Sequence, residues 1–196
     1  MGESERDDEE PIMTLCSDEE LAQVMQAMQS GASDELMLAE RLIDAYPDDA
    51  RLHFLRGSLL AGSGRLIEAH ASLTRAVALA PEFALARFQL GFFELTSGEA
   101  ARALATWQPL DNLPADHYLT QFVIGLRHLI ADRFAESIAA LEAGIAANEE
   151  NLPLNRDMQL IIDECASLVK GKASAPEEEA SATSVLLGQF GRGTTH

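Results

Sequence analysis

The chain has 196 residues, 47% of them hydrophobic, which is enough for one domain with a sizeable buried core. Its 14 Lys and Arg against 32 Asp and Glu residues give a net charge of −18, which argues against nucleic acid or an anionic membrane surface as a partner. No apolar run approaches the roughly 20 residues of a membrane-spanning helix. The first ten residues, MGESERDDEE, lack the basic start of a secretion signal. We therefore expect a cytoplasmic protein.

The acidic residues gather near the N-terminus, where residues 1–50 hold 15 acidic and 2 basic side chains. We expect residues 1–15 to form a disordered acidic arm, because like charges repel and nothing there can build a core. The composition of residues 171–196 predicts a flexible tail. This tail carries a short apolar motif, made of Val185, Leu186, Leu187 and Phe190.

Two helices are predicted ahead of the central part of the chain. The pattern at 17–20, Ser-Asp-Glu-Glu, is a capping box and predicts a helix that ends at Gly31. A second amphipathic helix, over about 34–46, ends before Pro47. Together they predict a divergent helical hairpin over 16–49.

The central part, residues 50–151, repeats every 34 residues. A glycine recurs at this interval inside an apolar helical pattern, at Gly57, Gly91 and Gly125. A bulky apolar residue follows at the same interval, at Leu73, Trp107 and Leu141. A third position carries Gly64, Gly98 and then Asp132. Because a glycine inside a helix costs about 1 kcal/mol relative to alanine, we expect each helical glycine to let two helix backbones approach closely.

A helix–turn–helix period of this length, with this alternation of small and bulky residues, resembles the tetratricopeptide repeat (TPR) family. The resemblance covers three repeats, 50–83, 84–117 and 118–151. It implies an all-α fold, a right-handed α-solenoid of about three repeats with flanking helices. The chain departs from the family at the aromatic position near the start of each first helix, where it has His53, Arg87 and Gln121.

A capping helix is predicted after the third repeat, over residues 152–170. Four apolar residues in it follow the i, i+3, i+4, i+7 spacing of a single helix face, namely Met158, Ile161, Ile162 and Cys165. The last repeat of a solenoid needs such a cover, because it otherwise leaves an apolar face exposed.

The resemblance also predicts a binding groove, because the first helix of each TPR repeat lines the concave face of the array. Nine apolar residues fall on this face by position: Phe54, Leu85, Phe88, Phe92, Leu95, Leu119, Phe122, Leu126 and Leu129. One interpretation is an exposed apolar groove that holds a segment of another protein. The alternative is that these residues are ordinary core between repeats. The tail motif, docked in cis or in trans, is a further candidate occupant.

No pattern in the sequence indicates an enzyme, a metal site or a cofactor. The histidines lack metal-ligand spacing, and no nucleophile has a local base. The two cysteines, Cys16 and Cys165, are expected to be reduced thiols. We therefore expect a non-enzymatic TPR adaptor that binds another protein of unknown identity. The alternatives are a small acidic secretion chaperone, similar to the type III translocator chaperones, which shields hydrophobic export substrates, and a regulatory subunit of an enzyme.

Overall fold

We describe the protein from a computed structural model, which defines residues 15–31 and 34–172. Over these residues the fold is all-α, as predicted, with nine α-helices, one 3₁₀ helix and no strand. Most of the acidic arm and the tail motif, Val185 to Phe190, lie outside the described residues. The predictions made for those two segments therefore stay predictions.

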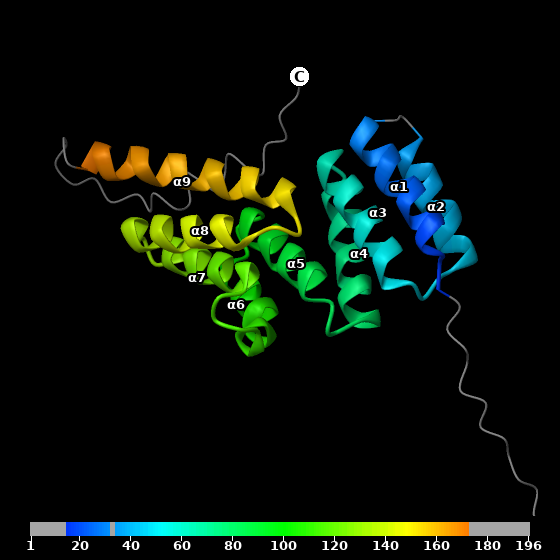
Figure 1. Ribbon diagram of the computed structural model, residues 1–196, viewed down its shortest axis with the longest axis horizontal. Coiled ribbons are helices and arrows are strands. Elements are labelled where there is room, and N and C mark those ends of the chain that lie inside the picture. The colour runs from blue at the N-terminus through cyan, green and yellow to red at the C-terminus, as the bar shows by residue number, and fades with distance from the viewer. Residues whose placement is uncertain (1–14, 32–33, 173–196) are drawn as a thin grey trace, which may run out of the picture. The chain divides into compact units, whose positions relative to one another are not determined.

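The chain divides into two compact units, which we describe separately. Unit 1 comprises residues 1–61 and 65–80, and unit 2 comprises residues 62–64 and 81–196. The helices associated with unit 1 are α1 (Asp18–Ser30), α2 (Glu35–Ala45), α3 (Ala50–Gly62) and α4 (Leu66–Leu79) (Figure 1). Those of unit 2 are α5 (Ala84–Thr96), α6 (Ala100–Trp107), the 3₁₀ helix η1 (Gln108–Asn112), α7 (Tyr118–Ile130), α8 (Phe134–Ala147) and α9 (Leu152–Lys172).

Helix α1 begins and ends at the residues that the sequence predicts. Ser17 accepts a hydrogen bond from the backbone N–H of Glu20, and the Glu20 carboxylate accepts one from the backbone N–H of Ser17, which confirms the predicted capping box. Gly31 ends the helix in the left-handed conformation, with φ of 64°. Its N–H donates to carbonyls of the last turn of α1.

Three helical hairpins share one geometry. The first helices α3, α5 and α7 begin at residues 50, 84 and 118, and the second helices α4, α6 and α8 begin at residues 66, 100 and 134. The turn between them holds one residue at positive φ: Gly64 (76°), Gly98 (86°) or Asp132 (56°). The next residue donates to the carbonyl five residues earlier: Arg65 to Leu60, Glu99 to Glu94, and Arg133 to His128, at 2.8–2.9 Å. The turn therefore recurs with the 34-residue period of the sequence.

The helical glycines mark close contacts within these hairpins, and at Gly57 and Gly125 the predicted close approach to a second helix backbone is present. A Cβ atom placed on Gly57 would lie 2.8 Å from Cγ of Leu73, and one placed on Gly125 would lie 2.6 Å from Cγ of Leu141. At both positions it would also lie 3.2 Å from the backbone nitrogen of the same leucine. A Cβ on Gly91 would overlap the indole of Trp107. Each glycine therefore makes room for the bulky residue of its own hairpin.

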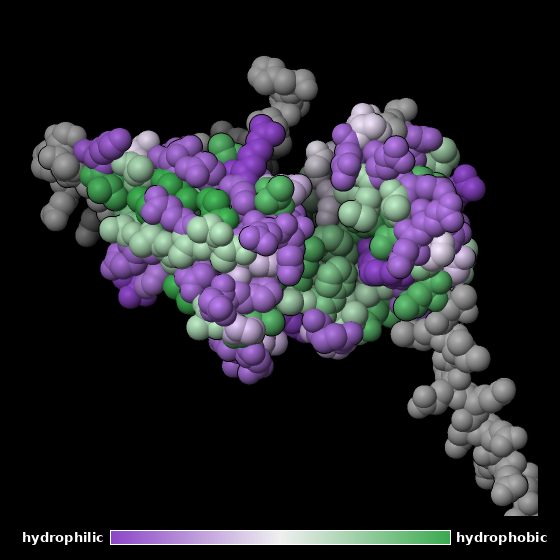
Figure 2. All heavy atoms as spheres, in the orientation of Figure 1, coloured by the Kyte–Doolittle hydropathy of each residue, from purple (hydrophilic) through white to green (hydrophobic). Residues whose placement is uncertain are grey.

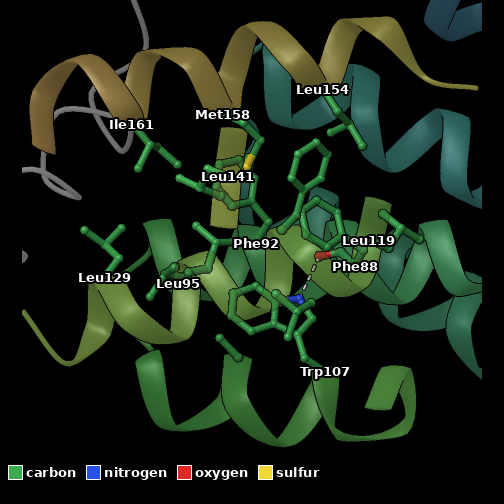
Figure 3. Close-up of a cluster of buried hydrophobic side chains, with 14 of the residues drawn as sticks. Phe88, Phe92, Leu95, Trp107, Leu119, Leu129, Leu141, Leu154, Met158 and Ile161 are labelled. Carbon is green, nitrogen blue, oxygen red and sulfur yellow. Dashed lines mark hydrogen bonds between the residues drawn. The ribbon is translucent and has the colours of Figure 1, made fainter. Parts of the chain in front are cut away.

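The core of unit 2 is built around the ring of Phe88 (Figure 3). Its centroid lies 6.1 Å from that of Phe92, 6.2 Å from that of Trp107 and 5.9 Å from that of Phe122. The Trp107 indole N–H donates to the Phe88 carbonyl oxygen at 3.0 Å. Because this bond satisfies the only polar atom of the indole, the tryptophan can be fully buried.

Helix α9 covers this core with one apolar face. Met158, Ile161, Ile162 and Cys165 are all buried, which confirms the predicted stripe. The turn before α9 is held by Asn148, whose side-chain amide donates to the Asn151 carbonyl and to the Asn155 side chain, both at 2.7 Å. Elsewhere on α9, Leu160 is half exposed.

Candidate functional site

The residues predicted to line the groove are mostly core residues. Seven of the nine have exposed fractions of 8% or less and belong to the apolar core of unit 2: Phe88, Phe92, Leu95, Leu119, Phe122, Leu126 and Leu129. The prediction that these seven form an open groove is therefore wrong, and the alternative, that they are core between helices, is correct. Phe54 and Leu85 are partly exposed.

The physical reason for this burial lies in how the helices of unit 2 converge. Phe88 and Phe92 on α5 and Phe122 on α7 pack against one another and against Trp107 of α6. Residues from α9, including Met158, complete the same cluster. The apolar face that the sequence predicts on α5 and α7 is thus buried against neighbouring helices of unit 2.

An apolar surface that remains accessible lies in unit 1, on α1 and α3. Three buried residues, Val24, Ala39 and Leu55, form a small core there. Leu21 and Met28 of α1 and Phe54 of α3 pack against this core but stay partly exposed. Met25 is 46% exposed. We call the set Leu21, Met25, Met28 and Phe54 the α1–α3 surface.

The three α1 residues of this surface share one side of the helix. Leu21, Met25 and Met28 are spaced i, i+4, i+7, which places them along a single stripe. One edge of the stripe packs against the core and the other faces outward. Sequence reasoning missed this surface because it used the family resemblance to choose groove residues and began with the first repeat, at residue 50. The signal that was present is the pair of methionines on one face of α1.

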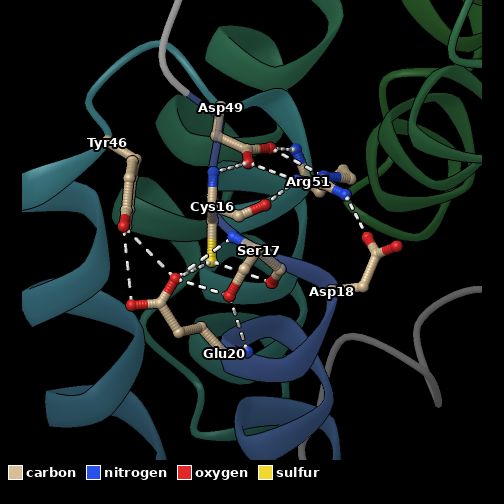
Figure 4. A network of polar contacts seen from close by, with 7 residues as sticks. All are labelled: Cys16, Ser17, Asp18, Glu20, Tyr46, Asp49 and Arg51. Carbon is tan, nitrogen blue, oxygen red and sulfur yellow. Dashed lines mark hydrogen bonds and ion pairs between the residues drawn. The ribbon is translucent and has the colours of Figure 1, made fainter.

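A network of polar contacts joins the start of α1 to the start of α3 (Figure 4). Its centre is Asp49, which is 1% exposed. Asp49 Oδ2 accepts from the Cys16 backbone N–H at 3.0 Å and from Arg51 Nη2 at 2.7 Å. Its Oδ1 accepts from the Arg51 backbone N–H and from Arg51 Nε, both at 3.0 Å. We call this network the Asp49 clamp.

Arg51 extends the Asp49 clamp in two directions. Its Nη2 donates to the Cys16 carbonyl oxygen at 2.6 Å, and its Nη1 forms an ion pair with Asp18 at 3.1 Å. The side chain therefore contacts the segment before α1, the first turn of α1 and the residue before α3. This arrangement fixes α1 against α3, the two helices that carry the α1–α3 surface.

The electrostatics of the clamp follow from these contacts. Burial alone would raise the pKa of Asp49, but the hydrogen bonds from Arg51 and from the Cys16 backbone lower it below its ordinary value. Hydrogen bonds from Ser17 lower the pKa of Glu20, and the Glu20 charge raises the pKa of Tyr46, whose hydroxyl donates to Glu20 at 3.2 Å. The two carboxylates are thus held in the ionised form.

The cysteines do not offer a reactive thiolate. Cys16 and Cys165 are both free and buried. Burial, and for Cys16 also the carboxylates of Glu20 and Asp49, raises the pKa of each thiol above its ordinary value. Both therefore stay protonated at neutral pH and pack as small apolar groups.

Carboxylates outnumber basic residues in the α1–α2 hairpin, and several of them pair with arginines that follow it in the chain: Asp49 with Arg51, Glu40 with Arg56, and Asp48 with Arg75. Residues 16–49 hold nine acidic side chains and a single basic one, Arg41. Asp18, at the N-terminal end of the α1 stripe, has a side chain that is 98% exposed. Within the described part of the chain, no ion pair is formed by Glu19, Asp34, Glu35 or Asp44.

The described residues show neither a cluster of metal ligands nor a membrane-spanning helix. Between residues 15 and 172, apart from 32 and 33, no three His, Cys, Asp or Glu side chains lie together in a way that could hold a metal ion. None of the helices described here combines the length and the apolar character that crossing a bilayer requires. Comparison with known proteins gives no assignment either: no protein-family model and no curated protein matches this chain.

Proposed function

We propose that this chain is a non-enzymatic protein-binding module, a right-handed α-solenoid of TPR-like hairpins with a divergent hairpin over 16–49. The recurrence of hairpin geometry supports this proposal. Helix starts, positive-φ turn residues and glycine contacts all repeat with the 34-residue period of the sequence. Repeats of this kind bury a continuous core by stacking and present their remaining helix faces to partners.

The observation that carries the binding role is the α1–α3 surface. Met25 is 46% exposed, and Leu21 and Met28 lie on the same side of α1 and are partly exposed; Phe54 of α3, also partly exposed, packs against the same small core as Leu21 and Met28. Accessible apolar side chains that lie together favour protein contact. The net charge of −18 makes another protein a better partner than nucleic acid. The free cysteines suit a reducing compartment such as the cytoplasm.

The chaperone alternative rests on the size and acidity of the chain and on a wide apolar groove for hydrophobic export substrates. Seven of the nine residues that would line that groove are buried in unit 2. What remains accessible is the smaller α1–α3 surface, which suits a single docked segment.

Site-specific photocrosslinking in the native cell tests the proposal. A photoreactive amino acid replaces Met25, Ile67 or Leu160, one at a time, in the full chain; all three side chains are at least 46% exposed, so the fold should tolerate the change. We expect a discrete protein adduct from the Met25 position, identified by mass spectrometry. Absence of any protein adduct from all three positions, with helical content preserved, would contradict a protein-binding role.

A further inference from the structure

We infer that His117 makes the start of α7 pH-sensitive, because it caps this helix only while its imidazole is neutral. The inference is independent of the proposed binding role. It rests on one hydrogen bond, in which the backbone N–H of Leu119 donates to Nδ1 of His117 at 3.1 Å. His117 is the N-cap residue of α7 and has an extended backbone, with φ of −65° and ψ of 132°. We call this contact the His117 cap.

The direction of this hydrogen bond fixes the protonation state of the ring. A backbone N–H can only donate, so Nδ1 of His117 must accept through a lone pair, which only the neutral imidazole has at this atom. A proton added to Nδ1 turns the acceptor into a second donor that faces the Leu119 N–H. Protonation also places a positive charge at the N-terminal end of α7, where the helix dipole disfavours cations. The His117 cap is therefore lost when the ring takes up a proton.

The other repeats carry different residues at the capping position. Asp49 lies two 34-residue periods before His117, and its Oδ1 accepts from the N–H of Arg51, also two residues on, at 3.0 Å. Phe83, one period before His117, caps α5 with no side-chain hydrogen bond. A carboxylate stays ionised, and thus an acceptor, above about pH 4, whereas imidazoles titrate between about pH 5 and 8. The cap of the third repeat therefore differs from that of the first in responding to mild acid.

No charged side chain pairs with His117 within residues 15–31 and 34–172. Its ring stacks on that of Tyr118, with centroids 4.8 Å apart, and this stack holds the ring beside Leu119. The charged groups of the surrounding elements are exposed or engaged elsewhere: Glu82, Asp116 and Glu149 are exposed, Arg87 of α5 donates to the Pro81 carbonyl, Asp111 of η1 pairs with Arg127, and Glu150 interacts with Tyr118. None of them replaces the lost hydrogen bond to the Leu119 N–H.

Solvent protons can reach the His117 cap. His117 is partly exposed, and residues 114–116 before it are exposed. This segment follows α6 and η1 in the chain, and Figure 2 shows mostly hydrophilic residues over α6. A proton can therefore be taken up without prior unfolding of α7.

The cap supports a segment that leads directly into the core of unit 2. Two further hydrogen bonds tie the connection to the first turn of α7, from Thr120 Oγ1 to the Pro114 carbonyl at 3.0 Å and from Gln121 Nε2 to the Ala115 carbonyl at 2.7 Å. Tyr118 and Leu119, on the same turn, belong to the buried cluster of unit 2. Loss of the His117 cap should therefore loosen this turn and lower the stability of unit 2.

Denaturant unfolding of the full chain at several pH values tests the inference. Trp107 shares the core of unit 2 with Tyr118 and Leu119, so its fluorescence reports on this unit. The matched variant is His117→Asn, because asparagine is a preferred N-cap residue and its Oδ1 accepts at every pH of the experiment. We expect similar unfolding equilibrium constants for the two proteins at about pH 8. At about pH 5.5 the constant of the wild type should be about fivefold the larger, because only the wild type has lost its cap.

Two further variants separate the cap from general histidine titration. His117→Ala removes the acceptor at every pH, so its unfolding constant should exceed that of the wild type about fivefold at about pH 8, and this difference should disappear at about pH 5.5. His53 is the control, since its Nε2 lies 2.8 Å from the Pro47 carbonyl, which can only accept. That ring donates, so protonation keeps the contact. The His53→Asn chain should therefore retain the loss of stability of unit 2 at low pH.

Hydrogen–deuterium exchange of the wild type adds a measurement that needs no variant. After correction for the intrinsic pH dependence of exchange, the amide of Leu119 should lose protection relative to that of Leu126, in the middle of α7, as the pH falls. Unfolding profiles of the wild type and His117→Asn that run parallel between about pH 8 and 5.5 would overturn the inference. A relative protection of Leu119 that does not change with pH would overturn it as well.

Discussion

A glycine recurs at the same position of three helical hairpins because it makes the same kind of close contact in each of them. Gly57, Gly91 and Gly125 each face the bulky residue that lies sixteen positions later in the chain. From the energetic cost of glycine in a helix, the sequence predicted that two helix backbones approach closely at these glycines. It did not predict which residue each glycine faces. The same logic explains the turn position, where Asp132 adopts a positive φ of 56° in place of glycine. Aspartate is among the few residues that tolerate this conformation.

Gly91→Ala should destabilise the protein by about 2 kcal/mol, because the new methyl group overlaps the buried Trp107 indole. The indole must shift, which also strains its hydrogen bond to Phe88. Denaturant unfolding followed by fluorescence measures the effect, since Trp107 is the sole tryptophan in the sequence.

Gly62→Ala is the matched control. Gly62 also lies in a helix, but a Cβ atom there would meet nothing within 4 Å. The free energy of unfolding of the Gly62→Ala variant should equal that of the wild type or exceed it slightly. Equal stability of the two variants would contradict the packing role of Gly91.

The Asp49 clamp acts at the scale of elements, because it joins α1 to α3. The sequence predicted the capping box at Ser17 but did not reveal that Asp49 binds the Cys16 backbone 33 positions away. Such a contact depends on how the helices are arranged. No local pattern in the sequence encodes it.

Asp49→Asn should lower the free energy of unfolding at pH 7 by about 2 kcal/mol, since a charged, buried hydrogen-bond acceptor is lost. The pKa of Asp49 is lowered in the folded state, so its contribution is complete above the unfolded value of about 4 and disappears as pH falls through the folded value. The difference between wild type and variant should therefore shrink below about pH 4. A difference that stays constant down to pH 2 would show that the Asp49 charge is not responsible.

Helix α9 also acts as a whole element, because one of its faces covers the core of unit 2. Met158→Ala should cost about 3 kcal/mol, because the side chain is fully buried in the core of unit 2. Leu160→Ala, two residues away on the same helix, should cost less than about 1 kcal/mol, because Leu160 is 50% exposed. Thermal unfolding of both variants provides the comparison. Similar losses would mean that the packed face of α9 has been assigned incorrectly.

At the scale of the whole molecule, the chain forms two compact units with unequal cores. Helices α1 and α2 each bury one residue, Val24 and Ala39, whereas α7 alone buries seven. Local stability follows the amount of buried apolar contact. The N-terminal hairpin is therefore the part of the described structure that we expect to open most readily.

Hydrogen–deuterium exchange tests this expectation. Backbone amides of α1 and α2 should exchange at least about tenfold faster than those of α7 and α8 under native conditions. Equal protection of the amides in all helices would contradict the expectation that α1 and α2 open more readily than α7 and α8.

The sequence by itself determined the all-α fold, the approximate bounds of α1, α2 and α9 and the 34-residue period, because each depends on neighbours in the chain or on a repeat within it. It did not determine which apolar face stays open. Phe88 and Phe122 have the same helical pattern whether they face a partner or a neighbouring helix. Only the tertiary structure decided that they are buried, because side chains from α6, α8 and α9 fill the space around them. Met25 stays 46% exposed because it lies outside the small core of unit 1, against which Phe54 packs.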